Sequence, residues 1–377
     1  MEVDTHPSIM MCNAPQRRAQ GSDGAGLLIV GNFLSGSVGT RGVCEELARQ
    51  LEDLDWLRVL TTSNKARRIP RLLDMLTTIW RRRNDFQVAQ VDVFSGAAFI
   101  WAEISCSALR RLDKPYILVL HGGNLPRFAA RWPHRVRRLL QSAQIVTTPS
   151  HYLREQMAAY HPNLLRVPNA IELGAYRFRL RQKPHPTLVW LRAFHEIYNP
   201  TLVPSVIHSL ADDYPDLRAI MIGPDKGDGS LEHTRQIAAE LGVGSRILFP
   251  GAVPKAETPA WLDQGDIFLN TSNVDNTPVS VLEAMACGLC VVSTNVGGLS
   301  YLLRDETDAL LVQPDSVEAM AAAVRRLMAE PGLAERLSGN ARVEASQYDW
   351  AAVLPQWESL LRSLCPSHGA VIESALE

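Results

Sequence analysis

Short apolar runs alternate with amphipathic stretches along nearly the whole chain, and this alternation restricts the fold more than any other feature. The runs have strand character, and the segments between them carry apolar residues at helical spacing. The first set of runs is 27–33, 57–62, 88–94, 116–121, 145–149 and 164–168. The second set is 187–191, 217–223, 246–249, 267–270, 290–293 and 309–312. Strands that alternate with helices predict an α/β protein with helix-covered parallel sheets.

The alternation stops once, in the Arg-, Lys- and Pro-rich stretch YRFRLRQKPHP at 176–186. A chain of 377 residues, 46% of them hydrophobic, is long enough to bury two cores. We therefore expect two domains of similar construction. The expected parts are a disordered N-terminus at 1–24, a first domain at 25–172, a linker at 173–186, a second domain at 187–349, a final helix at 350–365 and a frayed tail at 366–377.

A loop with several glycines, NFLSGSVGTRGVCEELARQL, follows the first predicted strand. Thr40 fits the cap of the next helix, and free backbone N–H groups at a helix start favour a phosphate. Gly39 and Thr40 are therefore candidates for phosphate contact. The alternative is an ordinary strand-to-helix turn, because the loop lacks the GxGxxG fingerprint.

A second polar loop leads into a predicted helix in NTSNVDNTPVSVLEAMACGLCVVSTNVGG. Pro278 fits the first helical turn, Asn276 or Thr277 the cap, and Gly288 the helix end. Glu283 would then lie beside an anion-binding helix end, where a carboxylate suits ribose hydroxyls below a diphosphate. Its apolar neighbours argue against the alternative of a solvated helical carboxylate.

This segment resembles the E-x7-E region of GT-B glycosyltransferases, in particular those of glycosyltransferase family 4. LEAMACGLCVVSTNVGG is similar to the family pattern EAMA-G-PVV-T--GG, with Glu283 as the second glutamate. We place Asn276 at the first glutamate position, which holds a donor-sugar hydroxyl in the family, with Asp275 adjacent as a substitute. The resemblance implies two Rossmann-like domains that face each other across a cleft, and a C-terminal helix that crosses back.

The stretch VWLRAFHEIYNP resembles the strand end at which the family grips the donor diphosphate with an arginine and a lysine. Arg192 matches the arginine, but Ile197 and Tyr198 stand where the lysine is expected. A lost charge-assisted hydrogen bond of roughly 1.5 to 3 kcal/mol calls for a replacement. The candidates are His195 and Lys226.

Three further segments resemble family elements. YILVLHGGNLP places His121 at a strand end where the family has a histidine that reaches the donor sugar; a structural histidine is the alternative. Val253, in RILFPGAVPKAE, would contact the nucleobase, or else be a core valine. Asn169, in RVPNAIEL, is expected to shape the turn toward the second domain rather than to do chemistry.

The resemblance implies a retaining transfer from a nucleotide-diphosphate sugar, a UDP or GDP sugar, to an acceptor hydroxyl. It implies no cofactor and no obligatory metal. Arg192 and the helix starts near Thr40 and Thr277 would hold the diphosphate, Glu283 the ribose, and His121 the donor sugar. The acceptor would be a glycan, a glycolipid or a small molecule of cell-surface polysaccharide or glycoconjugate synthesis. The alternatives are an epimerase of the same fold and a non-catalytic nucleotide- or glycan-binding protein.

The net charge of −2 conceals an asymmetry, because residues 1–185 hold 26 Lys and Arg against 15 Asp and Glu. Two basic stretches there carry Trp80 and Trp132, and predict basic amphipathic helices. Such helices suit an anionic membrane surface, although a solvated arginine face over an ordinary core is the alternative. Nucleic acid is not expected, since no reader motif accompanies them.

We expect a cytoplasmic protein, peripheral on the inner membrane face if these helices bind lipid, because no apolar run is long enough to span a bilayer. The six cysteines are expected to be reduced thiols. Cys287 and Cys290 form a CxxC, but no second pair lies nearby to complete four metal ligands, so no metal is predicted.

Overall fold

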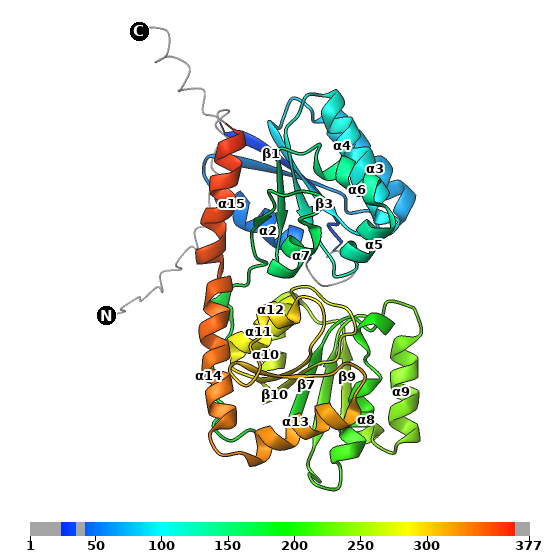
Figure 1. Cartoon of the computed structure of the whole chain (residues 1–377), viewed down its shortest axis with the longest axis vertical. Coiled ribbons are helices and arrows are strands. Elements are labelled where there is room, and N and C mark those ends of the chain that lie inside the picture. Colours follow the sequence, from blue (N-terminus) through cyan, green and yellow to red (C-terminus); the bar gives the residue numbers. More distant parts are fainter. Residues whose placement is uncertain (1–23, 35–41, 366–377) are drawn as a thin grey trace, which may run out of the picture.

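The two halves of the chain fold into two parallel six-stranded sheets, arranged one above the other along the long axis (Figure 1). The computed structural model describes residues 24–34 and 42–365, and every strand expected from the sequence is present in it. The first domain contains β1 (Ala25–Val30), β2 (Leu57–Thr62), β3 (Val88–Val93), β4 (Tyr116–Leu120), β5 (Ile145–Thr148) and β6 (Leu165–Arg166). The second contains β7 (Thr187–Leu191), β8 (Arg218–Ile222), β9 (Ile247–Gly251), β10 (Ile267–Asn270), β11 (Cys290–Thr294) and β12 (Ala309–Val312).

Helices follow the strands in both domains. Those of the first domain are α2 (Val43–Glu52), α3 (Arg68–Arg81), α4 (Ala98–Arg111), α5 (Leu125–Arg131), α6 (Pro133–Leu140) and α7 (His151–Met157). Those that follow are α8 (Leu202–Leu210), α9 (Ser230–Glu240), α10 (Thr258–Leu262), α11 (Val279–Cys287), α12 (Leu299–Leu302), α13 (Val317–Ala329), α14 (Leu333–Ala345) and α15 (Trp350–Leu364). The two basic stretches around Trp80 and Trp132 form α3, α5 and α6, as predicted.

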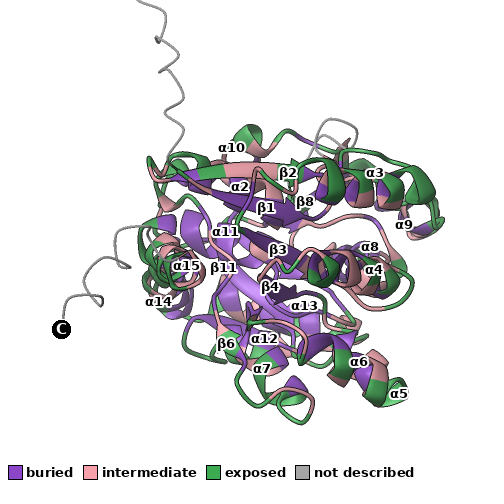
Figure 2. Ribbon diagram, turned by 90° about the horizontal axis from the view of Figure 1, so that it is seen from above, coloured by how far each residue is buried: buried purple, intermediate pink, exposed green. Residues whose placement is uncertain are grey.

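The apolar runs form the sheets because helices cover them on both faces. All residues of β4 and β11 are buried, which explains why these runs are continuously apolar rather than alternating. Figure 2 shows the buried strands in purple, with helices that turn exposed surface outward. Each domain therefore has its own core.

Both sheets have a point at which the strand order reverses. The orders are β2-β1-β3-β4-β5-β6 and β12-β11-β10-β7-β8-β9, so the reversals lie between β1 and β3 and between β7 and β10. Open α/β sheets bind ligands beyond the carboxyl ends of the strands at such switch points. The carboxyl ends of the two sheets face each other, because Gly123, after β4, lies against the backbone of Asp275, after β10.

The last helix, α15, returns to the first domain, as the resemblance implied (Figure 1). Trp350, Val353, Trp357 and Leu361 join a buried cluster with residues of β1 and α2. The indole Nε1 of Trp56 donates to Glu358 at 3.0 Å. The C-terminal end of the chain thus completes the core of the domain that begins it.

Two helix starts differ from the expected ones. Helix α11 begins at Val279 with Pro278 at its cap, so neither Asn276 nor Thr277 caps it. Helix α2 begins at Val43, and Gly42 takes the cap expected at Thr40. Proline has no N–H to leave unpaired at a helix start, which explains its place there. Helix α11 ends as predicted, with Gly288 at its C-cap in the left-handed region (φ 76°).

Candidate functional site

Arg192 lies at the switch point of the second sheet, directly after β7, as expected for a ligand-binding arginine. Its guanidinium forms an ion pair with Asp275 and lies 4.3 Å above the ring of Tyr198. Burial disfavours its charge, but the attraction of Asp275 outweighs burial and raises the pKa of Arg192. The guanidinium of Arg192 is therefore a fixed and permanently charged hydrogen-bond donor at the carboxyl end of this sheet.

Asp275, rather than Asn276, takes the first acidic position of the motif, because seven residues (276–282) separate Asp275 from Glu283. The placement of Asn276 at that position is wrong by one residue. The side chain of Asn276 instead accepts a hydrogen bond from the hydroxyl of Ser150 in the first domain. The motif thus keeps a carboxylate at both ends, with aspartate in place of the first glutamate.

Glu283 lies in α11, and only 4% of the residue is exposed, so it is not a solvated helical carboxylate. Its Oε1 accepts a hydrogen bond from the hydroxyl of Tyr176 at 2.6 Å and an ion-paired hydrogen bond from Lys255 Nζ. Burial and this carboxylate raise the pKa of Tyr176 above its ordinary value, so its hydroxyl stays protonated and donates. Among the described residues, no group donates to Oε2, which is left for a ligand hydroxyl.

A cavity of about 990 Å³ lies between the domains, with Glu283 in its wall. This volume is enough for a nucleotide, since ligand pockets commonly measure 300 to about 1,000 Å³. The second domain lines it with Tyr176, Leu191, Val279, Pro254, Lys255 and Glu283 among others, and the first with Gly42, Val43, Glu46 and Arg49. The domain interface is therefore hollow beside the carboxylate expected to hold a ribose.

His121 is buried at the carboxyl end of β4, and its side chain is 11% exposed. Its Nε2 lies 3.1 Å from Asp92 Oδ1, and the ring of Phe94 stacks on it with centroids 4.9 Å apart. The carboxylate of Asp92 favours a proton on Nε2, which leaves Nδ1 as the acceptor nitrogen. Asp92, near the end of β3, is a candidate site residue that sequence reasoning missed.

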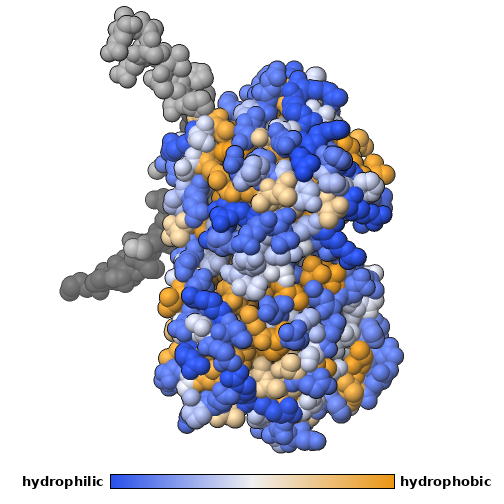
Figure 3. Space-filling view, in the orientation of Figure 1, coloured by the Kyte–Doolittle hydropathy of each residue, from blue (hydrophilic) through white to orange (hydrophobic). Residues whose placement is uncertain are grey.

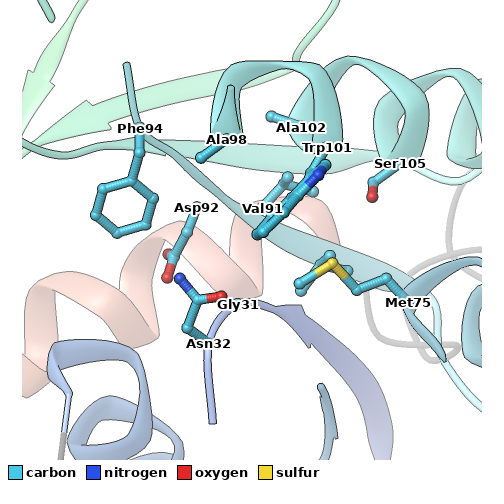
Figure 4. Close-up of a pocket in the computed structure, with 11 residues that line it drawn as sticks. Gly31, Asn32, Met75, Val91, Asp92, Phe94, Ala98, Trp101, Ala102 and Ser105 are labelled. Carbon is cyan, nitrogen blue, oxygen red and sulfur yellow. The ribbon is translucent and has the colours of Figure 1, made fainter. Parts of the chain in front are cut away.

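A pocket of about 20 Å³, room for about one water molecule, lies at the switch point of the first sheet. Figure 4 shows Asn32 and Asp92 pointing toward each other there, between the rings of Phe94 and Trp101. The guanidinium of Arg71 donates a hydrogen bond to Asn32 Oδ1 at 3.0 Å. Polar and aromatic side chains thus meet beside Asp92, the partner of His121.

The strand-end surfaces of the two domains touch each other at Gly123 and Asp275. A Cβ at Gly123 would lie 2.8 Å from the carbonyl oxygen of Asp275, so only glycine allows this approach. Asn169 Nδ2 donates to the carbonyl of Thr277 at 3.1 Å, which makes Asn169 an interdomain contact as well as a turn residue. These contacts place His121 and Arg192 on facing surfaces.

The remaining expected site residues lie elsewhere. The side chain of Val253 is buried in a core cluster, whereas its neighbours Pro254 and Lys255 line the cavity. Lys226 is exposed, and His195 accepts from its own loop, through Nδ1 from the N–H of Ile197 at 3.2 Å. Neither side chain lines the cavity. Gly39 and Thr40 lie outside the described residues.

Cys287 and Cys290 are buried, and burial raises the pKa of each thiol to about 12. Both are free cysteines, as are Cys44, Cys106 and Cys365. Within residues 24–34 and 42–365, no three His, Cys, Asp or Glu side chains are grouped as metal ligands require. These two thiols are core side chains.

Two family models match successive parts of the chain. The model described as "Glycosyltransferase Family 4" matches residues 40–174, and "Glycosyl transferases group 1" matches residues 176–344. The two matches meet at the boundary between the two sheets. Together they account for most of the chain.

Curated relatives match over shorter stretches. A D-inositol 3-phosphate glycosyltransferase of Streptomyces bingchenggensis is 29% identical over 205 residues, which are 52% of this chain and 45% of that protein. A GDP-mannose-dependent alpha-(1-6)-phosphatidylinositol monomannoside mannosyltransferase of Mycolicibacterium smegmatis is 26% identical over 244 residues, which are 59% and 62% of the two chains. The chain therefore matches less than two thirds of the length of either relative.

Solved structures share the fold over nearly the whole chain. The sucrose-phosphate synthase of Thermosynechococcus elongatus has a TM-score of 0.73 at 16% identity, covering 90% of this chain and 99% of that one. HepE of Anabaena, in complex with UDP and glucose, has a TM-score of 0.70 at 16% identity, covering 90% and 100%. At these identities, the likeness establishes the arrangement of the two domains.

Proposed function

We propose that this chain, which belongs to the group 1 glycosyltransferases of family 4 and has the GT-B fold, transfers a sugar from a nucleotide-diphosphate donor to an acceptor hydroxyl with retention. The observation that carries the proposal is that the carboxyl ends of the two sheets face each other beside an interdomain cavity that Glu283 and Lys255 line. His121 and Asp92 lie at strand ends of the first sheet and line a smaller pocket of about 20 Å³, and Arg192 and Asp275 lie at strand ends of the second sheet. A donor bound to the second domain would present its sugar to the first.

In this mechanism, the second domain holds the nucleotide. Glu283 binds the ribose hydroxyls through Oε2, and Arg192 stabilises the negative charge that develops on the departing diphosphate. Asp275 orients Arg192 and accepts a hydroxyl of the donor sugar. Permanent positive charge and backbone N–H groups at the start of α11 then stabilise the leaving group without a bound metal.

The reaction breaks the bond between the anomeric carbon and the diphosphate oxygen, and forms one between that carbon and the acceptor oxygen. The acceptor proton passes to the departing phosphate oxygen on the same face, which retains the anomeric configuration. His121, held by Asp92 and Phe94, orients the donor sugar. Water must be excluded while the bond at the anomeric carbon breaks, because water would otherwise replace the acceptor. In this proposal, closure of the two domains excludes it.

The donor is a UDP or GDP sugar in this proposal, because HepE was solved with UDP and the mycobacterial relative uses GDP-mannose. We expect the purified chain to melt at a higher temperature with one of these donors in a thermal-shift screen of UDP, GDP, ADP, CMP and dTDP sugars. Binding at about one hundred times Kd stabilises the native state by about 2.7 kcal/mol. A selective shift would identify the base.

Detection by mass spectrometry of the sugar on an acceptor distinguishes this proposal from its alternatives. An epimerase would change the donor sugar without an acceptor, and a non-catalytic protein would bind a donor without turnover across acceptor panels. Absence of a shift with every donor would contradict the proposal.

We further propose that the acceptor is a membrane-associated glycan or glycolipid of cell-surface synthesis, because one face of the first domain suits an anionic membrane. Helices α3, α4, α5 and α6 lie together on the side opposite α15 in both ribbon views (Figures 1 and 2). Residues 68–140 hold 13 Lys and Arg against 5 Asp and Glu. The described residues contain no helix long and apolar enough to cross a bilayer.

Apolar side chains on this face are unusually exposed for a soluble surface: Ile69 (75%), Trp80 (60%), Leu73 (57%), Trp132 (46%), Ile100 (42%) and Ile104 (36%). Figure 3 shows apolar surface at the outer edge of the first domain, beside hydrophilic side chains. The guanidinium of Arg83 lies 5.0 Å above the ring of Trp80. Tryptophan beside arginine is typical of the interface between acyl chains and headgroups.

We expect the chain to cosediment with vesicles of phosphatidylcholine and phosphatidylglycerol, but only weakly with phosphatidylcholine alone. Each basic residue at an anionic surface contributes about 1 kcal/mol, and added salt should weaken the binding. The triple variant Ile69→Ser, Leu73→Ser, Trp80→Ser should lose most of it. The matched variant Leu248→Ser, Val343→Ser, which removes exposed apolar side chains of the second domain, should not. Equal binding of both variants to the anionic vesicles would contradict the proposal that this face of the first domain binds the membrane.

A further inference from the structure

The donor site of this chain lacks one expected cation, and the side chain in its place cannot supply the charge. Ile197 and Tyr198 stand where the diphosphate lysine is expected, in the loop after β7. The two substitutes suggested by the sequence, His195 and Lys226, do not line the interdomain cavity. A nucleoside diphosphate carries more than one negative charge, so Arg192 alone leaves part of that charge without a partner.

Two described cations line the cavity, and they differ in their partners. The guanidinium of Arg49 donates to Glu46 at 2.8 Å and lies 3.9 Å from Glu172, so acidic groups of its own surroundings already engage it. Lys255 comes from the second domain, in the turn after β9 that also presents Pro254 to the cavity. Lys255 is the lysine of the second domain that lines the interdomain cavity.

The contact of Lys255 with Glu283 fixes where its ammonium lies. Glu283 is the carboxylate expected to hold the ribose, so the ammonium lies within one hydrogen bond of the ribose position. The ribose carries the α-phosphate on its 5′ carbon, and the lysine side chain is 34% exposed and extends on a flexible stem. An ammonium has three N–H donors, and Glu283 is its one partner among the described residues.

We propose that Lys255 supplies the second cation of the donor site by bridging Glu283 and the α-phosphate of the bound nucleotide, in place of the lysine missing from the loop after β7. This inference rests on the proposed function. In the free protein, Glu283 holds the ammonium at the edge of the cavity. On binding, the ribose hydroxyls donate to Oε2 of Glu283 while the two remaining ammonium donors contact phosphate oxygens.

The bridge predicts an effect that depends on phosphate. Replacing Lys255 by methionine keeps the length of the side chain and removes its charge. The affinity for UDP and UMP, or for GDP and GMP, should fall about 10- to 100-fold, the equivalent of one charge-assisted hydrogen bond. The affinity for uridine or guanosine should change less than about threefold, because a nucleoside offers no phosphate.

The experiment is a ligand-observed NMR titration of the full chain with both series: UDP, UMP and uridine, and GDP, GMP and guanosine. Lys183→Met, an exposed lysine outside the cavity, is the matched control, and Lys226→Met tests the rival position. Lys255→Arg keeps the charge and should retain the preference for phosphorylated ligands. It also keeps the proposal testable if Lys255→Met lowers the melting temperature.

Four results would overturn the inference. Equal losses for nucleotide and nucleoside would show that Lys255 acts only through the ribose carboxylate. Unchanged affinity in Lys255→Met, or a phosphate-dependent loss in Lys226→Met instead, would place the second cation elsewhere. Failure of the unaltered chain to bind either series would overturn the proposed function and this inference with it, whereas the first three outcomes leave the proposed function intact.

Discussion

Substitution of Glu283 by alanine should reduce kcat/KM for glycosyl transfer at least about 100-fold, the size of two lost hydrogen bonds from ribose hydroxyls to a charged acceptor. Oε2 of this carboxylate is free for the ribose, and ribose hydroxyls bonded to a charged acceptor each contribute about 1.5 to 3 kcal/mol. Because the ribose is remote from the reacting bond, most of the loss should appear in the KM for the donor. Initial rates at varied donor concentration measure this directly.

Folding must be separated from binding in this test, because alanine leaves Tyr176 and Lys255 without their shared partner. Glu283→Gln keeps the shape and can still accept from Tyr176, so its melting temperature should stay closer to that of the unaltered chain. Glu257→Gln, an exposed glutamate that does not line the cavity, is the matched control. Near-normal transfer by a folded Glu283→Gln would remove Glu283 from the donor site.

Replacement of His121 by alanine should also lower transfer at least about 100-fold, with kcat affected more than the KM for the donor. The imidazole is held on two sides, by Asp92 and by the ring of Phe94, so its free nitrogen has a fixed direction. In the proposed mechanism, this nitrogen acts on the sugar rather than on the nucleotide. Measuring kcat with the donor at saturation distinguishes it from Glu283.

Asp92→Ala provides the second arm of this experiment. If Asp92 positions His121, its loss should lower kcat by a smaller factor than His121→Ala, and the double variant should be no worse than His121→Ala alone. His233→Ala, on the exposed face of α9, removes an imidazole far from the cleft and should transfer normally. Full activity in a folded His121→Ala would leave this histidine a purely structural role.

The strands were predictable because burial on both faces demands uninterrupted apolar runs. β2, β7, β10 and β12 begin and end where the sequence pattern does, and the other strands differ by a few residues at their ends. The helix starts were less predictable. Gly42 and Pro278 take the N-cap positions without capping side chains of their own, and at α2 the side chain of Glu45 accepts from the N–H of Gly42 instead.

Candidate site residues that lie within one sequence motif could be predicted. Those that come together only through tertiary contacts could not. Arg192 and Glu283 each lie in a motif whose spacing is visible in the chain. Asp92, Tyr176 and Lys255 become site residues only because folding brings them to His121 or Glu283, over separations of 29, 107 and 28 residues. No local pattern marks them, although a carboxylate at a strand end such as Asp92 could have been a candidate.

The return of α15 to the first domain has a consequence for biosynthesis. The first sheet leaves the ribosome before the second, yet Trp350, Val353, Trp357 and Leu361, which belong to the core beside β1, are made after both sheets. The first domain is therefore completed only after the second sheet has been translated, and until then its apolar surface beside β1 has no cover. A message cut short after the second sheet would yield a nascent chain with an open hydrophobic groove, a target for chaperones and proteases rather than a partial enzyme.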